Sequence, residues 1–370
     1  MSFRFDFGDE GECTPATPVT KEEITSALDT VEVTVAVAPK SHTFAELLQS
    51  CLDKHIAYEP VEVTSDCALY RRALFDVRHQ LMFEDDRLSA SSSNNGSNDE
   101  EMKILLGETG EDLRNGVYEG GMKSWECSFD LAEYLKKTGA IRQLAGQERS
   151  AIIEIGCGTA LPTLYALEQL YDLPMDSAGK KNKKKVSIVL TDFNYDVLRL
   201  VSVPNVFLSW ANRFAGERYP ETFARPGEVL CTRELIDGCV AWFEENGIEI
   251  TCVSGTWGRD FVNIVDDIVG REATRLVLTS ETIYAPEVLP VLCEVVCTLM
   301  HSFSDTNANH AVIAAKDIYF GVGGTVAEAE RVLAALCHST DLSLRREVAA
   351  PGHSGSVQRS LLVLGASGSV

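Results

Sequence analysis

From about residue 118 onward, the chain alternates short apolar segments with longer segments of helical character. Short apolar runs are typical of strands buried on both faces, and their alternation with helices predicts a parallel sheet with helices on either side. The last two runs have no helix between them, which predicts a closing hairpin with one antiparallel strand. The predicted strands are 151–155, 186–190, 249–253, 275–279, 310–315, 342–349 and 359–364. Residues 118–370 are therefore predicted to form an α/β domain with a doubly wound, seven-stranded sheet.

The sequence before this domain divides into two regions. Residues 1–40 carry many threonine, proline and acidic residues and are expected to be a disordered acidic N-terminal region. Residues 41–117 are expected to form a small N-terminal cap that contains a polar low-complexity loop at 88–101. In the cap, apolar residues alternate in places at 56–63 and 73–83, which favours strands, and a helix is the alternative for the second segment.

Two insertions interrupt the α/β domain. Five lysines in the turn 179–185 could contact RNA, although a short exposed basic turn is more often simply solvated. Residues 207–247 have an apparently helical pattern and precede the third predicted strand.

The net charge of −22 argues against tight binding to a nucleic-acid backbone. The first 120 residues hold 24 acidic and 10 basic side chains, so they contribute −14 of that charge. Such an acidic region could steer a basic protein partner towards the molecule, or it could serve only solubility.

The eleven cysteines are scattered without Cys-x-x-Cys pairs, and the seven histidines are dispersed among them. This distribution favours buried free thiols over disulfides and predicts no metal site. The longest apolar runs are too short or too interrupted to cross a bilayer, and the N-terminus lacks the apolar core of a secretory signal. We therefore expect an intracellular protein without a membrane segment.

The turn after the first predicted strand reads Gly156-Cys-Gly158-Thr-Ala160, and a helix is expected to start near Pro162. Ligands of open α/β sheets bind at the carboxyl ends of the strands, where glycines allow close approach of the backbone. A dinucleotide-binding turn would need a third glycine where Leu161 stands, and no Gly-Lys-Ser/Thr sequence marks a P-loop. A cofactor without a pyrophosphate fits this turn better.

Asp192 ends the second predicted strand, next to the Gly156–Ala160 turn. A carboxylate there can accept hydrogen bonds from both hydroxyls of a ribose. The alternative is that Asp192 caps the helix that begins at Asn194 or Tyr195.

The third and fourth predicted strands also end in residues suited to a site. Trp257 could stack on or enclose an adenine ring, and ordinary packing is the alternative. Glu281 and Tyr284 could form a hydrogen-bonding pair, and a capping Ser280 with an exposed Glu281 is equally compatible with the pattern.

Five segments resemble the histidine protein methyltransferase family, seven-stranded enzymes that methylate a histidine of a large-subunit ribosomal protein. They are Phe75–Met82, Val117–Cys127, Val203–Val206, Leu278–Tyr284 and Lys316–Gly324, and the alternating Phe3, Phe5 and Phe7 also resemble the N-terminus of that family. The likeness runs from residue 1 to about residue 340 and implies a class I methyltransferase fold that uses S-adenosylmethionine and releases S-adenosylhomocysteine.

The resemblance also implies which residues contact the cofactor. Ser124, Trp125, Glu126, Cys127 and Ser128 would pass across it, although Trp125 could instead be a core residue. Gly156 and Gly158 would approach the methionine part, and Asp192, Phe193 and Asn194 would hold the ribose and flank the adenine. Gly255, Thr256, Trp257 and Ser280 would complete the site. Ala160 departs from the third glycine of the generic methyltransferase turn.

The expected reaction is the attack of a histidine ring nitrogen on the sulfonium methyl group. Much of the histidine is neutral at cytosolic pH, because its usual pKa is about 6.5, so positioning matters more than a strong base. Glu281 is the candidate that accepts the other ring N–H, and Tyr284 would shape the substrate slot.

Three alternatives to this reaction remain open. A lysine methyltransferase is the nearest, because Glu281-x-x-Tyr284 also resembles the acidic-x-x-aromatic motif of related lysine-modifying enzymes. Nucleic-acid methylation fits less well, because a Pro-Pro-Tyr signature is missing. A non-catalytic adaptor that keeps the fold is the third. The expected partner is a basic ribosomal protein, and the expected state is a monomer in the cytoplasm and nucleus.

Overall fold

The computed structural model describes residues 26–29, 37–89, 120–173, 184–301, 308–340, 342–349 and 357–366, and of 85–89 only the backbone. Most of the N-terminal region 1–40, most of the polar loop 88–101 and residues 179–183 of the lysine turn lie outside the described residues. The expectations for those segments stay predictions.

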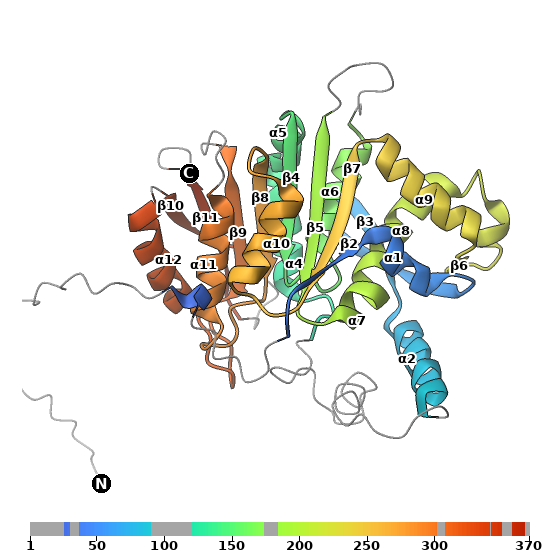
Figure 1. The fold of residues 1–370 in the computed structure, drawn as a ribbon, viewed down its shortest axis with the longest axis horizontal. Helices are drawn as coiled ribbons and strands as arrows, with labels where there is room; N and C mark the ends of the chain where they lie inside the picture. Colours follow the sequence, from blue (N-terminus) through green and yellow to red (C-terminus); the bar gives the residue numbers. More distant parts are fainter. Residues whose placement is uncertain are drawn as a thin grey trace, which may run out of the picture.

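An eight-stranded sheet forms the centre of the protein, in the order β1-β7-β5-β4-β8-β9-β11-β10 (Figure 1). Neighbours from β7 to β9 are parallel, whereas β11 is antiparallel to both β9 and β10. The seven predicted strands and the closing hairpin are therefore confirmed. The strands are β1 (Lys40–Thr43), β4 (Arg149–Ile155), β5 (Lys185–Asp192), β7 (Ile248–Ser254), β8 (Thr274–Ser280), β9 (His310–Lys316), β10 (Leu342–Val348) and β11 (Arg359–Ala366).

The eighth strand, β1, pairs antiparallel with β7 at the edge of the sheet. Its residues Lys40–Thr43 carry no apolar run, so the pattern that predicted the other strands could not predict this one. β1 places the N-terminal part of the described chain beside the carboxyl end of β7, because Lys40 is paired with Ser254.

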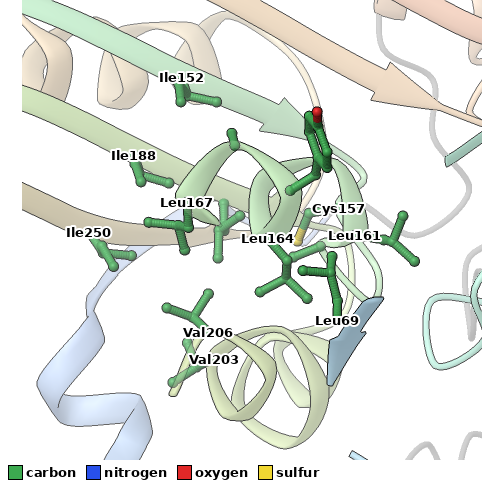
Figure 2. Packing of buried hydrophobic residues seen from close by; sticks show 14 of the residues in the cluster. Leu69, Ile152, Cys157, Leu161, Leu164, Leu167, Ile188, Val203, Val206 and Ile250 are labelled. Atoms are coloured by element: carbon green, nitrogen blue, oxygen red, sulfur yellow. The ribbon is translucent and has the colours of Figure 1, made fainter. Parts of the chain in front are cut away.

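Two hydrophobic layers cover the sheet, because successive side chains of a strand point to opposite faces. On one face, Ile152, Ile188 and Ile250 pack against α6 and α8, as Figure 2 shows. On the other face, Ile153 and Val189 pack with residues of α10, α11 and α12. Burial on both faces explains why the parallel strands are almost wholly apolar.

The helices surround the sheet as expected for a doubly wound fold (Figure 1). The α-helices are α1 (Phe44–Leu48), α2 (Leu74–Ser89), α4 (Glu126–Thr138), α5 (Ala140–Ala145), α6 (Leu161–Tyr171), α7 (Tyr195–Val197), α8 (Val203–Trp210), α9 (Arg233–Glu245), α10 (Arg259–Val269), α11 (Leu289–Met300) and α12 (Val326–Thr340). Short 3-10 segments are η1 (Ala27–Asp29), η2 (Gln49–Cys51) and η5 (Pro220–Phe223), and π-helical turns are η3 (Leu198–Ser202) and η4 (Ala211–Ala215).

A second, three-stranded sheet has the order β3-β2-β6 and is called the small sheet below. β2 (His55–Thr64) confirms the strand predicted at 56–63, and β3 (Cys67–Arg72) follows it. β6 (Glu228–Leu230) comes from the insertion 207–247, which was predicted as helical and is otherwise largely so. The small sheet therefore joins an N-terminal segment to an insertion of the α/β domain.

The strand favoured at 73–83 is wrong, and the helical alternative holds. These residues belong to α2, which projects at the lower right of Figure 1. Val77 and Leu81 lie one helical turn apart and pack into a small cluster with Val197 and Leu200. The apparent alternation arose because Phe75 and Phe83 are also apolar but are exposed on another face of the helix.

The ten described cysteines are free, and all except Cys67 are buried, which agrees with the prediction of buried thiols. The described helices include none that is long and apolar enough to span a bilayer. Among the described histidine, cysteine and acidic side chains, no group of three or more is arranged to hold a metal ion.

Candidate active site

The turn between β4 and α6, residues 156–160, is called the first turn. Gly156, Gly158 and Ala160 all have left-handed backbone angles, with φ of 63°, 49° and 57°. A side chain at Gly156 would place its Cβ 2.6 Å from Cγ2 of Thr282, and one at Gly158 would lie 2.9 Å from the carbonyl oxygen of Gly121. Both glycines are therefore required by conformation and by space, whereas Ala160 carries left-handed strain that a glycine would avoid.

Glu154 fixes the helix that follows the first turn. Its buried carboxylate accepts hydrogen bonds from the backbone N–H of Thr163, over 3.1 Å, and from the Thr163 hydroxyl. These bonds satisfy donors at the start of α6. Burial raises the pKa of Glu154 to about 8.

Asp192 lies beside the first turn at the end of β5. Its Oδ2 accepts the N–H of Gly158 over 3.1 Å, and its Oδ1 accepts the N–H of Asn194 over 3.1 Å. Asn194, not Asp192, is the N-cap residue of α7. The Asp192 carboxylate is buried, and burial raises its pKa to about 6. A buried carboxylate with acceptor capacity to spare suits a ligand that carries hydroxyl groups.

Gly121 covers the same carboxylate. A Cβ at Gly121 would lie 3.2 Å from Oδ2 of Asp192. Residues 120–125, called the cover segment, are held by the indole N–H of Trp125, which donates to the carbonyl of Gly120 over 3.0 Å. The Ser124 hydroxyl lies 2.9 Å from that of Thr159 in the first turn. The structure therefore brings Ser124, Gly158 and Asp192 together.

Trp257 reaches the other side of the first turn. Its Cζ2 would lie 3.7 Å from a Cβ at Gly156. The indole N–H of Trp257 is buried and has no hydrogen-bond partner within the described part of the chain. Buried indole N–H groups normally find an acceptor, so this one is suited to donate to a bound ligand.

Gly255 and Thr256, by contrast, contact residues 37–39. A Cβ at Gly255 would be 2.8 Å from Cα of Pro39, and the N–H of Thr256 donates to the carbonyl of Val37 over 2.9 Å. The Gly255 N–H donates to the carbonyls of Asp192 and Phe193. These contacts connect the ends of β5 and β7 through the backbone.

Glu281 follows β8 in a left-handed conformation, with φ of 58°, which is strained for a residue with a side chain. Its carboxylate accepts the Tyr319 hydroxyl proton over 2.7 Å and the Cys127 N–H over 3.3 Å, and it lies 3.5 Å from the Lys316 ammonium. We call Glu281, Lys316 and Tyr319 the Glu281 cluster. Burial raises the pKa of Tyr319, so its hydroxyl remains a donor.

Lys316 joins the Glu281 cluster to the start of α4. Its ammonium lies 2.9 Å from the Glu126 carboxylate and 5.2 Å from the centre of the Trp125 ring. Burial alone would lower the pKa of Lys316, but Glu126 and Glu281 raise it above its usual value. The side chain of Cys127 is buried in the core, and the Ser128 hydroxyl donates to the Trp125 carbonyl, so both residues support the start of α4.

The loops after β8 and β9 are locked together. The Gly324 N–H donates to the Tyr284 carbonyl over 2.8 Å, and a Cβ at Gly324 would lie 2.0 Å from the Ile283 carbonyl oxygen. The rings of Tyr284 and Tyr319 are 6.5 Å apart. Ser280 is paired with Ala314 in the β8–β9 register. The hydroxyl that donates to the Glu281 carboxylate is that of Tyr319, a residue for which the sequence predicted no role.

No model of a protein family matches the chain. The chain is similar to Histidine protein methyltransferase 1 of Saccharomyces cerevisiae, with 37% identity over 325 residues that cover 84% of this chain and 81% of that protein. The protein of the same name from Schizosaccharomyces pombe is 32% identical over 258 residues, which cover 70% of this chain and 66% of that protein.

Solved structures that resemble the chain are more distant. The methyltransferase domain of bacterial CtHen1-C has 12% identity and a TM-score of 0.33, covering 64% of this chain and 98% of that one. The plantazolicin methyltransferase BamL has 8% identity and a TM-score of 0.36, covering 65% and 85%. The relationship to the budding-yeast protein, at 37% identity, spans most of both chains. The chain therefore belongs to the histidine protein methyltransferase family.

Proposed function

We propose that this methyltransferase takes its methyl group from S-adenosylmethionine and transfers it to a histidine ring nitrogen of a protein. The observation that carries the cofactor assignment is the convergence of two unusual groups on the first turn. These are the buried carboxylate of Asp192 beside Gly158 and the buried indole N–H of Trp257 beside Gly156, which has no partner among the described residues.

The residues present fit this cofactor. Asp192 would accept hydrogen bonds from the ribose hydroxyls, and Phe193 and Asn194 would flank the adenine. Trp257 would direct its N–H to the ligand, and the first turn would lie along the methionine part. When bound, S-adenosylmethionine supplies an electrophilic methyl group on a sulfonium centre.

Glu281 is the residue of this chain that we propose as acceptor for an N–H group of the substrate. Its carboxylate is held by Tyr319, Lys316 and the Cys127 N–H, so its position is fixed before a substrate arrives. A carboxylate offers about four acceptor positions, which leaves capacity for one more donor. We assign Glu281 to the N–H of the substrate ring nitrogen that is not methylated, so that it stabilises the charge that develops on the ring.

The substrate that we propose is a basic protein of the large ribosomal subunit. The family relationship supports a protein-histidine substrate, since the matched relatives carry that activity in their names. The net charge of −22 favours attraction of a basic partner over binding of a nucleic acid. We propose that the protein acts as a monomer in the cytoplasm and nucleus.

The direct test is incubation of the purified protein with labelled S-adenosylmethionine and ribosomal proteins from cells that lack it. We expect one labelled band, and peptide mapping should place the label on a histidine. Label on a lysine would assign the lysine alternative instead. That reaction must first deprotonate an ammonium, so its rate should rise more steeply with pH than that of a histidine enzyme.

Calorimetry with S-adenosylhomocysteine, read together with the labelling experiment, distinguishes an enzyme from a non-catalytic adaptor. We expect the wild-type protein to bind this product in a saturable manner. If it binds the product but methylates nothing, the adaptor alternative holds. If it does not bind the product at all, the cofactor assignment is wrong.

A further inference from the structure

Arg71 connects the small sheet to the first turn. It lies near the end of β3, and its Nη1 donates to the Ser124 hydroxyl over 2.8 Å. Ser124 in turn lies 2.9 Å from the hydroxyl of Thr159, the residue that follows Gly158. Two hydroxyl groups therefore link a guanidinium from outside the α/β domain to the turn assigned above to the methionine part of the cofactor.

The guanidinium has donors to spare. Its Nε donates to Oε1 of Glu59 over 2.9 Å, and its Nη2 lies 2.7 Å from the same oxygen. A guanidinium carries five N–H groups, so these contacts and the one to Ser124 leave others for a ligand. The side chains of Arg71 and Glu59 are 31% and 48% exposed. Ion pairs this exposed are weakly held, so the pair with Glu59 can yield to a better placed anion.

The hydroxyl groups are also oriented for an anion. Because Ser124 accepts a hydrogen bond from Arg71, its own proton can be donated to Thr159. The proton of the Thr159 hydroxyl is then free to point to a ligand. Thr159 is buried, so a hydrogen bond from it would be little weakened by water.

The charged groups near the first turn indicate which part of the cofactor Arg71 would bind. Asp192, which hydrogen-bonds to the first turn, is acidic, and Glu154, which hydrogen-bonds to the start of α6, supplies no positive charge. S-adenosylmethionine carries two positive groups, the sulfonium and the α-ammonium, and one negative group, the α-carboxylate. Arg71 has the matching sign for that carboxylate, and it hydrogen-bonds to Ser124 of the cover segment, next to the first turn.

We propose that Arg71 binds the α-carboxylate of the cofactor, with the Ser124 and Thr159 hydroxyls as further donors. The inference rests on the proposed function and adds a cofactor-binding residue that lies in the small sheet. Arginine suits this role because its planar fork can hold both oxygens of a carboxylate. The small sheet is then part of the cofactor site and not only a lateral addition to the fold.

Two probes separate this role from a structural one. S-adenosylhomocysteine keeps the amino-acid end of the cofactor, whereas 5′-methylthioadenosine keeps the adenosine and the thioether but lacks the carboxylate. Binding of both is measured by calorimetry on the full chain. Arg71→Met removes the charge but keeps an apolar stem, and Arg71→Lys keeps the charge but loses the fork. Arg225→Met is the matched control, because Arg225 pairs with Glu228 of the small sheet over 3.3 Å.

We expect Arg71→Met to weaken S-adenosylhomocysteine binding about 10- to 100-fold and to change methylthioadenosine binding less than about twofold. The affinity of Arg71→Lys for S-adenosylhomocysteine should lie between those of the wild type and Arg71→Met. If Arg71→Met does not fold, Arg71→Lys takes its place in the comparison. Arg225→Met should change neither affinity. Unchanged S-adenosylhomocysteine binding, or an equal loss for both probes, would overturn the proposal. Absence of S-adenosylhomocysteine binding by the wild type would instead count against the proposed function.

Discussion

The backbone N–H of Gly158 lies 3.1 Å from Oδ2 of Asp192 and donates to it. This bond joins the turn after β4 to the end of β5, two strands that are neighbours in the sheet. It also keeps a carboxylate buried, where burial raises its pKa to about 6. A buried charge held by a few backbone donors is expensive for the fold, which is why we attribute a ligand-binding role to Asp192.

Asp192→Asn tests that role. An amide has one acceptor oxygen where the carboxylate has two, so the variant should lose hydrogen bonds to a ribose. We expect the affinity for S-adenosylhomocysteine to fall about 10- to 100-fold, measured by calorimetry. Asp237→Asn, at an exposed position on α9, is the control and should bind as the wild type does. Equal affinities for Asp192→Asn and the wild type would refute ribose recognition by this carboxylate.

Glu154→Gln should change how stability depends on pH. The folded protein holds the Glu154 proton up to a pKa of about 8, whereas a glutamate in an unfolded chain releases it near 4.5. The free energy of unfolding therefore falls as pH rises through this window, and the loss is complete above pH 8. The glutamine variant keeps the acceptor for Thr163 but does not titrate.

Between pH 6 and pH 9, the wild type should lose about 3 kcal/mol more of its free energy of unfolding than Glu154→Gln. Denaturant titrations at the two pH values measure this difference. Parallel losses in the two proteins would mean that Glu154 is not the group that titrates.

The sequence predicts the parts of this fold that local patterns encode. The parallel strands are apolar because both faces are buried, so Ile152 and Ile153 reveal β4 without any structure. The first turn and Asp192 could also be predicted, because both sit at strand ends that the topology must bring together. β1 could not, since Lys40–Thr43 has no apolar pattern and is stabilised by its pairing with β7.

Three residues around the candidate site could not be predicted from the sequence for a different reason. Arg71, Lys316 and Tyr319 contact partners that lie far away in the sequence. For example, 38 positions separate Tyr319 from Glu281, and 53 separate Arg71 from Ser124. Their contacts depend on how β9 and β3 pack, which local patterns do not report. Lys316 and Tyr319 did lie in a segment that resembles the family, and that was the one signal available for them.

Gly156→Ala tests whether the first turn needs glycine for space as well as for conformation. Gly139, the C-cap residue of α4, has nearly the same φ, 64° against 63°, but no atom within 4 Å of an added Cβ. Gly139→Ala should therefore cost only the left-handed strain, about 1 kcal/mol. Gly156→Ala should cost at least about 1 kcal/mol more, because its Cβ would lie 2.6 Å from Cγ2 of Thr282.

Denaturant titration of both variants measures the difference. Thr282→Ser removes Cγ2, so the double variant Gly156→Ala/Thr282→Ser should recover part of the loss. If Gly156→Ala and Gly139→Ala are equally stable, the contact with Thr282 does not constrain the turn.

Glu281→Gln separates chemistry from cofactor binding. The amide cannot stabilise positive charge on a substrate ring as a carboxylate does, so kcat should fall at least about tenfold. The affinity for S-adenosylhomocysteine should stay within about twofold, because Glu281 is not assigned to the cofactor. Glu330→Gln is the control, since Glu330 also pairs with a basic side chain, Arg346 over 3.5 Å, but lies on α12 outside the candidate site. Equal turnover of Glu281→Gln and Glu330→Gln would remove Glu281 from the reaction.

Phe320 is the side chain that we expect to contact the protein substrate. It is 77% exposed on the loop after β9, next to Tyr319, whose hydroxyl holds the Glu281 carboxylate. Ile318 and Val322 are exposed on the same loop, so a small apolar surface borders the Glu281 cluster. An exposed apolar side chain beside the group that we propose for catalysis is well placed to pack against substrate residues that flank the methylated one.

Phe320→Ser should therefore raise KM for the protein substrate about tenfold and leave both kcat and the affinity for S-adenosylhomocysteine nearly unchanged. Val348→Ser is the matched control, because Val348 is 64% exposed but lies at the end of β10, on an edge strand of the sheet. Rates are measured with labelled S-adenosylmethionine and unmethylated ribosomal proteins as substrate. A fall in kcat without a change in KM would mean that the loop supports Tyr319 and Glu281 and does not contact the substrate. Equal KM values for Phe320→Ser and Val348→Ser would show that the substrate approaches from elsewhere.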